Sequence, residues 1–137
     1  YRDALWHSAD MIGTGVASFS HVGGIHFQNK PHWDGYLQDI AEGRLPLNRA
    51  FDPTEDERLT REVILQLKLG HIQADYFQDK FSVDILDRYN TQFRKLDDEG
   101  MLSVSDRKIT LSRRGFLRVD QLLPVFYDPK YQNARYT

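Results

Sequence analysis

Two glycines near the N-terminus have the spacing of a ligand-binding turn. Gly13 and Gly15 flank Thr14, and apolar residues stand on either side of them at Met11, Ile12, Val16 and Phe19. Glycines at this spacing allow a tight turn and the close approach of another group. We therefore expect a buried strand over residues 11–16 that ends in a loop at a ligand-binding edge. Gly-x-Gly alone also fits an ordinary strand and turn, and Ser18 stands where the third glycine of a dinucleotide-binding fingerprint would fall.

Histidines are concentrated in the same part of the chain, at His7, His21, His26 and His32. Imidazole ligates metal ions and haem iron, so this group raises a metal-site or haem-site hypothesis. The spacing matches no compact ligand motif, and no cysteine or neighbouring acidic pair completes a site. Loop histidines with ordinary hydrogen bonds are the favoured interpretation, and we assign no metal ligand in this chain.

Candidate nucleophiles and acid–base pairs are weaker still. Ser18 and Ser20 lack the flanking glycines of a nucleophile elbow. The acidic run at residues 97–99 is expected at the negative end of a helix, where carboxylates are destabilised and face solvent. We assign no catalytic residue in this chain.

A small basic group near the C-terminus consists of Arg113, Arg114 and Arg118. Arginine binds carboxylates through two parallel hydrogen bonds, so this group could meet the carboxylates of a ligand. Salt bridges that dock one domain on another would use the same residues.

The elements that position these residues fall into two predicted domains. In residues 1–53 the strand and an irregular loop precede a helix over about residues 35–42, capped by Asp34 and ended by Gly43. Residues 44–53 read as a connector because they contain Pro46 and Pro53. The second predicted domain covers residues 54–137.

The second domain reads as α+β and mainly helical. Thr54 and Glu57 form a capping box, and apolar residues follow at helical spacing at Leu59, Val63, Ile64 and Leu67. Two more helices are expected over residues 74–80 and from Asp84 to about Gly100. Two short strands over residues 101–104 and 108–111 come next, followed by a last helix capped by Ser112. Three helices, a two-stranded wing and a last helix form a winged-helix pattern.

Charge argues against the DNA-binding function that a winged helix invites. The helix after Asp84, which would enter the major groove, carries five acidic and three basic residues over positions 84–99. That balance opposes binding to phosphates. The turn between the strands carries Arg107 and Lys108, so one small basic patch remains.

Composition sets outer bounds on function. The 137 residues are 40% hydrophobic and 28% charged, with a net charge of −2, so no strong field attracts nucleic acid or an anionic membrane. No apolar run approaches the roughly 18 residues of a spanning helix, and a cytoplasmic protein is the expectation. The start at Tyr1 favours a piece of a longer chain. Cysteine is absent, which excludes disulfides and any thiolate-held cluster on these residues.

The most specific feature of the chain is the order of several short stretches. They are residues 12–20 (IGTGVASFS), 27–29 (FQN), 36–37 (YL), 43–46 (GRLP), 61–67 (REVILQL), Leu96 with Gly100, and 109–111 (ITL) leading to Gly115. In this order and spacing they resemble the C-terminal part of the anaerobic, oxygen-independent coproporphyrinogen III oxidase-like radical S-adenosylmethionine family.

The resemblance implies a place in heme and tetrapyrrole biosynthesis. Enzymes of that family generate a 5′-deoxyadenosyl radical from S-adenosylmethionine on a [4Fe-4S] cluster, and oxidatively decarboxylate the propionates of a porphyrinogen. Three cysteines of an N-terminal barrel hold the cluster, and none of them has a counterpart here. The resemblance therefore implies a parent that is an oxidoreductase, and a segment that is not catalytic alone. Its expected partners are the missing barrel and the tetrapyrrole substrate.

By the same resemblance, Gly13, Gly15 and Phe19 line the cofactor and substrate cavity at the end of the barrel. Gln28 and Asn29 fix the loop beside it and contact substrate. Residues 1–53 then contain a remnant strand and loop of the barrel, and the winged domain covers the cavity and excludes water.

Two alternatives stay open. One is a haem- or porphyrin-binding chaperone module of the same lineage, for which Trp6, Phe19, Phe27 and Trp33 offer aromatic contacts. The other is a nucleic-acid or protein adaptor that uses the winged domain alone.

Overall fold

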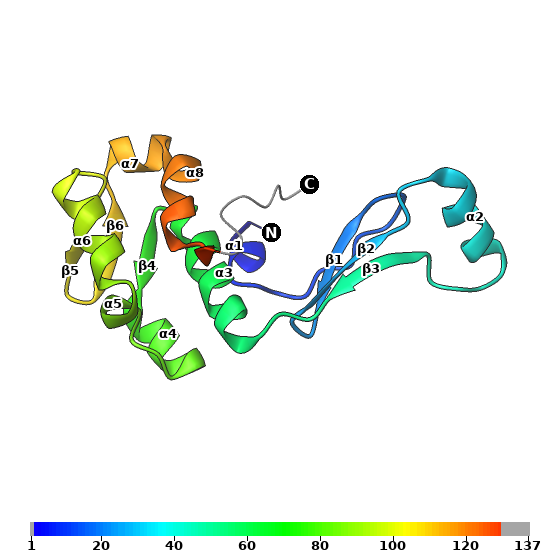
Figure 1. Ribbon diagram of the computed structural model, residues 1–137, viewed down its shortest axis with the longest axis horizontal. Coiled ribbons are helices and arrows are strands. Elements are labelled where there is room, and N and C mark those ends of the chain that lie inside the picture. The colour runs from blue at the N-terminus through cyan, green and yellow to red at the C-terminus, as the bar shows by residue number, and fades with distance from the viewer. Residues whose placement is uncertain (1, 130–137) are drawn as a thin grey trace. The chain divides into compact units, whose positions relative to one another are not determined.

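The computed structural model describes residues 2–129. Within this range it is a mixed α and β structure with two three-stranded antiparallel sheets (Figure 1). The chain divides into two compact units, Tyr1–Arg58 and Leu59–Thr137, which we call unit 1 and unit 2. No helix among the described residues combines the length and apolar character needed to cross a bilayer.

Unit 1 is built on the sheet β1-β2-β3. Strand β1 (Phe19–Val22) and strand β2 (Ile25–Asn29) form a hairpin, and β3 (Leu47–Phe51) pairs with the other edge of β2. Gly23 and Gly24 make the hairpin turn with positive φ angles of 58° and 85°. A two-residue hairpin turn of this kind needs positive φ at both positions, so glycine suits each of them. Helix α1 (Arg2–Trp6) precedes the sheet.

The strand predicted over residues 11–16 does not form, and that prediction is wrong. Met11 makes only an isolated bridge with His21, and residues 12–18 are a loop. Gly15 and Ala17 have φ angles of 103° and 60°, which take the backbone out of the extended conformation. The first strand therefore begins only at Phe19.

The connector predicted over residues 44–53 contains a strand that the sequence did not reveal. All five residues of β3 are exposed. A strand without a buried face lacks the alternation of apolar and polar residues by which strands are recognised. Strand β3 also lies at the edge of the sheet, where it pairs on one side only.

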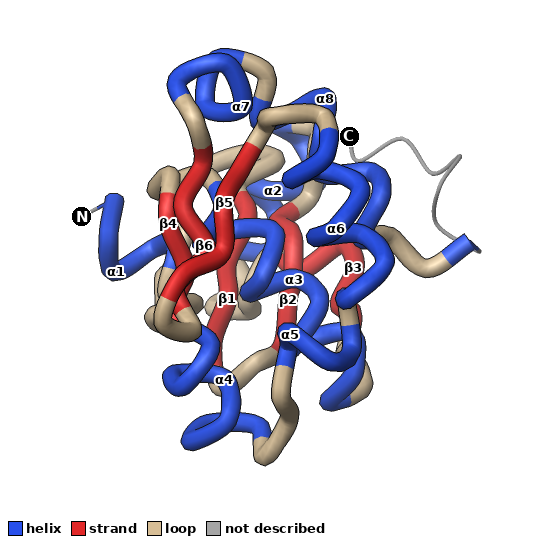
Figure 2. The backbone as a smooth tube through the Cα atoms, turned by 90° about the vertical axis from the view of Figure 1, so that its left-hand side faces the viewer, coloured by secondary structure: helices blue, strands red, loops and turns tan. Residues whose placement is uncertain are grey.

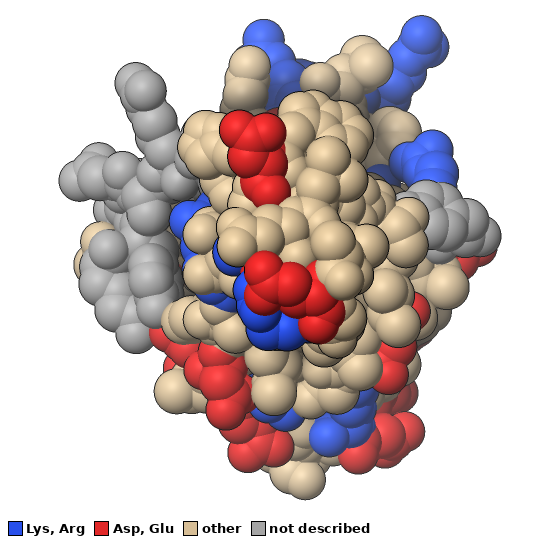
Figure 3. All heavy atoms as spheres, turned by 90° about the vertical axis from the view of Figure 1, so that its right-hand side faces the viewer, with Lys and Arg blue, Asp and Glu red and all other residues tan. Residues whose placement is uncertain are grey.

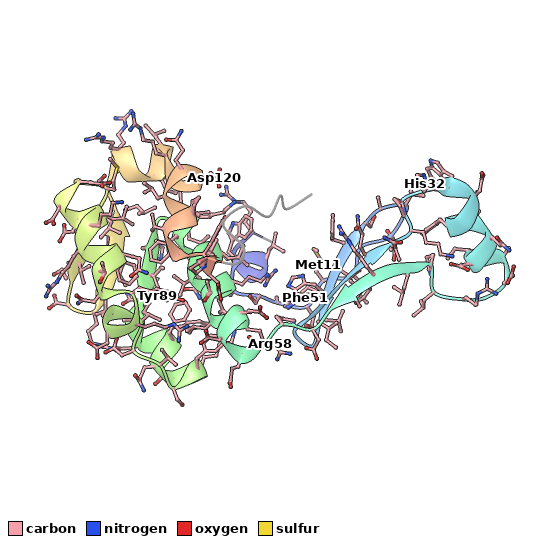
Figure 4. All side chains as sticks on the ribbon, in the orientation of Figure 1. Met11, His32, Phe51, Arg58, Tyr89 and Asp120 are labelled. Atoms are coloured by element: carbon pink, nitrogen blue, oxygen red, sulfur yellow. The ribbon has the colours of Figure 1, made fainter. Side chains whose placement is uncertain are left out.

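Helix α2 (Trp33–Ala41) confirms the helix predicted over about residues 35–42, but its cap differs. The N-cap is His32, and Asp34 lies in the first turn (Figure 4). The buried carboxylate of Asp39 accepts from Lys30 Nζ at 2.6 Å and from Arg44 Nη2 at 2.8 Å. The contacts with Lys30 and then Arg44 lower the pKa of Asp39. This ion-pair group ties the helix to the chain before and after it.

Unit 1 has no hydrophobic core among its described residues. Its buried residues are polar or proline: Ser20, His21, Asn29, Asp39, Pro46 and Pro53. Its exposed large apolar residues are Ile12, Phe19, Val22, Ile25, Trp33, Leu37, Ile40, Leu45, Leu47 and Phe51. In the view of Figure 3, toward the α2 end, most of the surface is neither acidic nor basic. Large apolar residues that are exposed in such numbers, beside no buried apolar core, favour a surface that another part of a protein covers.

Unit 2 contains all the buried large apolar side chains of the described residues. Its elements are α3 (Glu55–Leu67, which begins in unit 1), β4 (His71–Gln73), α4 (Ala74–Phe81), α5 (Ile85–Arg88), α6 (Asn90–Asp98), β5 (Leu102–Ser105), β6 (Lys108–Leu111), α7 (Arg113–Leu117), α8 (Val119–Leu122) and a 3-10 helix, η1 (Leu123–Phe126). The tail from residue 130 onward, predicted to belong to this domain, lies outside the described residues.

The capping box predicted at the start of α3 is confirmed. The amide of Thr54 donates to Glu57 Oε2 at 2.9 Å, and the amide of Glu57 donates to Thr54 Oγ1 at 3.2 Å. Each side chain satisfies a backbone donor that the first turn of a helix leaves without a partner. The helix then buries Leu59, Val63 and Leu67.

The sheet of unit 2 has three strands rather than the two predicted. Figure 2 shows the order β4-β6-β5, in which β4 adds to the predicted pair. Ile72 of β4 lies opposite Ile109 of β6, and both are buried. Strand β4 has only three residues, which is too short for a period of two to be recognised.

An aromatic cluster fills the core beside α5 and α6. The single helix predicted from Asp84 to Gly100 breaks at Tyr89 into these two. The ring of Tyr89 lies 5.4 Å from that of Phe126 and 6.3 Å from that of Phe93. The Tyr89 hydroxyl forms a hydrogen bond of 2.8 Å with Thr60 Oγ1, so this buried phenol has a polar partner (Figure 4).

A buried carboxylate links α3 to α4. Glu62 is 2% exposed and accepts from Lys80 Nζ at 2.8 Å and from the hydroxyl of Tyr76. Burial and the bond to Glu62 raise the pKa of Tyr76. Burial alone would lower the pKa of Lys80, but its bonds to Glu62 and Tyr76 outweigh this and raise it. The network compensates the cost of burying a charge.

Replacing Lys80 with methionine should destabilise unit 2 because it leaves the Glu62 carboxylate buried without its ammonium partner. Breaking a buried pair costs about 3–5 kcal/mol; Lys80 is partly exposed, so we expect about 1–3 kcal/mol. Urea unfolding followed by circular dichroism measures the change. Lys95→Met, at an exposed position of α6, is the matched control and should change stability by less than about 0.5 kcal/mol. Equal stability of the two variants would contradict the assigned role.

Arg107, in the turn between β5 and β6, is held by two carboxylates. Its Nε donates to Asp75 at 2.5 Å and its Nη1 donates to Asp84 at 3.0 Å. The bonds to Asp75 and then Asp84 raise the pKa of Arg107. The bond from Arg107, followed by that from the Leu86 amide, lowers the pKa of Asp84. This guanidinium, assigned to a basic patch from the sequence, is engaged within the fold.

The lowered pKa of Asp84 predicts a loss of stability in acid. A lowered carboxyl pKa contributes stability above the ordinary value of 3.8, and this contribution disappears as the pH falls through the native pKa. Asp84→Asn keeps the helix cap but removes the charge, so it should unfold at lower urea than the wild type at pH 7. The difference should shrink as the pH falls below 3.8. Asp87→Asn, on the same helix, is the control; a pH-independent difference for Asp84→Asn would refute the assignment.

Candidate functional site

The loop over residues 12–18, which we call the glycine loop, is attached to the β1-β2 hairpin by side chains. The amide of Gly13 donates to Ser20 Oγ at 3.0 Å. The side-chain amide of Asn29 donates to the carbonyl of Gly13 at 3.3 Å and to that of Gly15 at 3.0 Å. Since Asn29 and Ser20 are both buried, these bonds are shielded from water.

Further bonds complete the attachment. Gln28 Nε2 donates to the carbonyl of Ala17 at 3.1 Å, and Arg49 Nε on β3 donates to Gln28 Oε1 at 2.8 Å. The amide of Gly15 donates to the hydroxyl of Tyr36 on α2 at 3.2 Å. The glycine loop is therefore fixed by residues from β1, β2 and α2.

Both glycines are required by the geometry of the loop. A Cβ atom on Gly13 would lie 2.2 Å from the carbonyl oxygen of Phe19, which is a backbone atom with no freedom to rotate away. Gly15 has a φ angle of 103°, which side chains rarely allow. Gly13 thus allows a close approach and Gly15 an unusual backbone angle, as the spacing predicted, but in a loop rather than in a strand.

The structure brings the five predicted site residues together. Gly13 packs on the backbone of Phe19, Phe19 lies opposite Gln28 in the hairpin, and Asn29 bonds both glycines. Phe19 is 50% exposed, so its ring is accessible for contact. The prediction that Gln28 and Asn29 fix the loop agrees with these bonds, whereas binding of a cofactor or substrate by any of the five stays a prediction.

Two residues of the site were missed as supports of the loop. Ser20 was weighed only as a nucleophile, and Tyr36 entered only through the family resemblance. Ser20 stands between Phe19 and His21, and these neighbours give no signal that its hydroxyl has a buried partner. Nothing in the spacing of Tyr36 relates it to Gly15.

The histidines do not converge on a metal site. His21 and His26 stack across the hairpin with ring centroids 4.5 Å apart, but His7 bonds the carbonyl of Asp3, and His32 stands at the N-cap position of α2 without a side-chain cap bond. Among residues 2–129, no group of three or more His, Cys, Asp or Glu side chains is arranged to hold a metal ion.

The glycine loop carries no charged side chain, so it offers a contact surface rather than acid–base groups. Its contacts with the hairpin and α2 are made by backbone groups, hydroxyls and neutral amides, and Ile12 and Phe19 present apolar surface. Without cysteine, its residues do not fit a thiolate-held iron–sulfur cluster. The arrangement suits binding and positioning of a ligand rather than proton transfer.

A family model and several curated relatives match this chain. Residues 54–118 match the model of the HemN C-terminal domain. The chain is 28% identical over 120 residues to the oxygen-independent coproporphyrinogen III oxidase of Helicobacter pylori, covering 84% of this chain and 26% of the relative. Its identity to the enzyme of the same name from Pseudomonas aeruginosa is 24% over 135 residues, covering 93% of this chain and 29% of the relative.

A solved structure has the same fold. It is described as coproporphyrinogen III oxidase (HemN) from Escherichia coli, a radical SAM enzyme. The TM-score is 0.74 at 22% identity, over 86% of this chain and 28% of the other. The chain thus spans roughly a quarter of the length of the relatives that it matches.

These matches confirm the resemblance seen in the sequence. The chain is similar to the C-terminal region of the oxygen-independent coproporphyrinogen III oxidase-like radical SAM family, and residues 54–118 match the HemN C-terminal domain.

Gly13→Ala should detach the glycine loop from the hairpin because the new methyl group cannot coexist with the Phe19 carbonyl. We expect a local cost of about 1–3 kcal/mol, seen as at least about tenfold faster amide hydrogen exchange over residues 11–21. Gly35→Ala is the control, because a Cβ there meets only the flexible end of Lys30 at 3.3 Å. Unchanged exchange in Gly13→Ala would show that the loop does not depend on this close approach.

Proposed function

We propose that this chain is the C-terminal segment of a radical SAM coproporphyrinogen III oxidase-like enzyme and is not catalytic alone. The observation that carries the proposal is the match of most of the chain to enzymes named oxygen-independent coproporphyrinogen III oxidase. In such an enzyme S-adenosylmethionine and the cluster supply a radical that acts on porphyrinogen propionates, in heme biosynthesis. The cluster would belong to residues outside this chain.

The glycine loop would form one wall of the cavity in which cofactor and substrate meet. Gly13, Gly15 and Phe19 would line it. The amides of Gln28 and Asn29 are already bonded to Ala17, Gly13 and Gly15. Their contribution to substrate binding would therefore be to hold the loop in place. This assignment makes them positioning residues, in agreement with their neutral, buried surroundings.

The apolar surface of unit 1 supports an N-terminal barrel as its partner. A unit without a hydrophobic core gains little from burial on its own. The length of the relatives leaves about three quarters of an enzyme to provide the missing contacts. In this proposal, residues 1–53 contribute the end of the barrel.

Unit 2 would act as a cover over the cavity. Its order of elements, α3-β4-α4-α5-α6-β5-β6, supports the winged-helix interpretation, with β5 and β6 as the wing. Engagement of Arg107 by Asp75 and Asp84 removes a cation that a DNA-binding wing would present. A protein-facing cover that excludes water is therefore favoured over a nucleic-acid adaptor.

A haem or porphyrin carrier is the second candidate, and the stacked pair of His21 and His26 is the observation that favours it. The two imidazoles lie close to Phe19, a residue exposed enough to contact a planar ring. In this function the chain would hold a tetrapyrrole without decarboxylating it.

The test uses the product of the full coding sequence that contains this chain, purified without oxygen and with its cluster intact. We expect it to convert coproporphyrinogen propionates to vinyl groups in the presence of S-adenosylmethionine and a reductant. Chromatography of the oxidised porphyrins measures this conversion. A variant that carries Gly13→Ala should turn over at least about tenfold more slowly, because one wall of the cavity is displaced. Gly35→Ala should retain the rate.

The carrier function predicts haem binding without conversion of coproporphyrinogen. A full-length protein with an intact cluster that leaves coproporphyrinogen unchanged, yet binds haem with a Soret shift lost in His21→Ala and His26→Ala, would overturn the oxidase proposal. Binding to duplex DNA at low salt that falls steeply as salt is added would instead indicate the adaptor.

A further inference from the structure

One residue of helix α7, Gly115, packs directly against the backbone of unit 2. Ser112 caps the helix by accepting from the amide of Gly115 at 3.0 Å. A Cβ on Gly115 would lie 1.9 Å from the carbonyl oxygen of Met101, so the helix touches the backbone just before β5 at this point. Gly115 therefore defines the buried side of α7.

Three arginines and an apolar residue stand on the exposed part of α7 and at its C-cap. Arg113, Leu117 and Arg114 lie in α7 within an arc of about 100° that does not include Gly115, and Arg118 follows as the C-cap. Leu117 is 77% exposed, and all three arginines are exposed. In Figure 4 side chains project outward from this helix. We call these four residues the arginine face.

The arginine face differs from the cationic side chains that are held within the fold. Arg44, Lys80 and Arg107 are each held by carboxylates. Across residues 2–129, by contrast, no ion pair or hydrogen bond engages the guanidinium groups of the arginine face. Three exposed guanidinium groups without internal partners, beside an exposed leucine, form a surface that is cationic and apolar at once.

We propose that the arginine face binds a tetrapyrrole polycarboxylate, with Leu117 against the apolar ring system and the guanidinium groups on its propionates. The inference rests on the proposed function and adds a second contact to the glycine loop. Guanidinium pairs with carboxylate through two parallel hydrogen bonds. The exposed leucine adds apolar contact when the ligand covers it. Coproporphyrinogen, which names the relatives, carries four carboxylates around an apolar macrocycle, so the charges are complementary.

The surroundings favour a compact ligand over an extended polyanion. Ser112 Oγ donates to the carbonyl of Gly100 at 2.8 Å, so the end of α6 lies beside the start of α7. That end carries Asp97, Asp98 and Glu99. A nucleic acid or an anionic bilayer laid across α7 would meet these carboxylates, so the acidic end of α6 disfavours an extended polyanion. On the following helix, Asp120 is paired with Lys68 at 2.9 Å (Figure 4).

Metal-free coproporphyrin III is the probe, because it has the four carboxylates of the substrate and no iron for a histidine to ligate. Quenching of its fluorescence by the 137-residue chain gives the dissociation constant. The triple variant Arg113→Ala, Arg114→Ala, Arg118→Ala should bind at least about tenfold more weakly, and Leu117→Asp should also weaken binding. Arg94→Ala, an exposed arginine of α6, should bind as the wild type does. Circular dichroism confirms that each variant is folded.

A second probe isolates the carboxylates. Mesoporphyrin has the same ring with two propionates, and we expect it to bind about three- to tenfold more weakly than coproporphyrin, with the difference reduced in high salt. Equal affinity of the wild type and the triple variant for coproporphyrin would overturn the proposal. Tighter binding of an acidic peptide than of coproporphyrin to the arginine face would overturn it too, and would assign the face to a polypeptide partner.

Failure of this inference can be told apart from failure of the proposed function. A full-length enzyme that decarboxylates coproporphyrinogen equally well with and without the three arginines retains the proposed function and removes only the second contact. Loss of decarboxylation in the wild type itself removes the function, whatever the arginine face binds.

Discussion

The side-chain amide of Asn29 is the interaction on which unit 1 depends most. It joins the carbonyls of Gly13 and Gly15 to the end of β2, and Ser20 and Tyr36 bind the amides of the same two glycines. The loop is thus held by directional polar contacts rather than by packing. Polar contacts fix a geometry but contribute modestly to net stability, so unit 1 has a well-defined loop geometry and little stabilisation of its own from apolar burial.

Unit 2 is stabilised in a different way. Its apolar side chains converge on one core, and a buried carboxylate, Glu62, is compensated by Tyr76 and Lys80. Unit 2 therefore has the buried core that a compact domain needs to keep its shape. The contrast between the units follows from their sequences, because apolar residues recur at helical spacing after Leu59, whereas those of unit 1 are left exposed.

Local patterns could be predicted from the sequence, and contacts across the chain could not. The capping box of Thr54 and Glu57 and the cap at Ser112 depend on residues three positions apart, and both form as predicted. Strand β3 escaped notice because it buries no face, and residues 11–16 were misread because their apolar residues suggest a strand. The two glycines were singled out from their spacing. The hydrogen bond between Gly15 and Tyr36 could not be predicted, because the two residues are 21 positions apart.

The central claim is that unit 1 is completed by the rest of a larger enzyme. Amide hydrogen exchange over residues 11–51, compared between this chain alone and the product of the full coding sequence, tests it most directly. The account predicts fast exchange in the isolated chain and protection greater by at least about a hundredfold in the full-length protein, with unit 2 nearly unchanged. Equal protection of residues 11–51 in both samples would contradict it, since unit 1 would then need no partner.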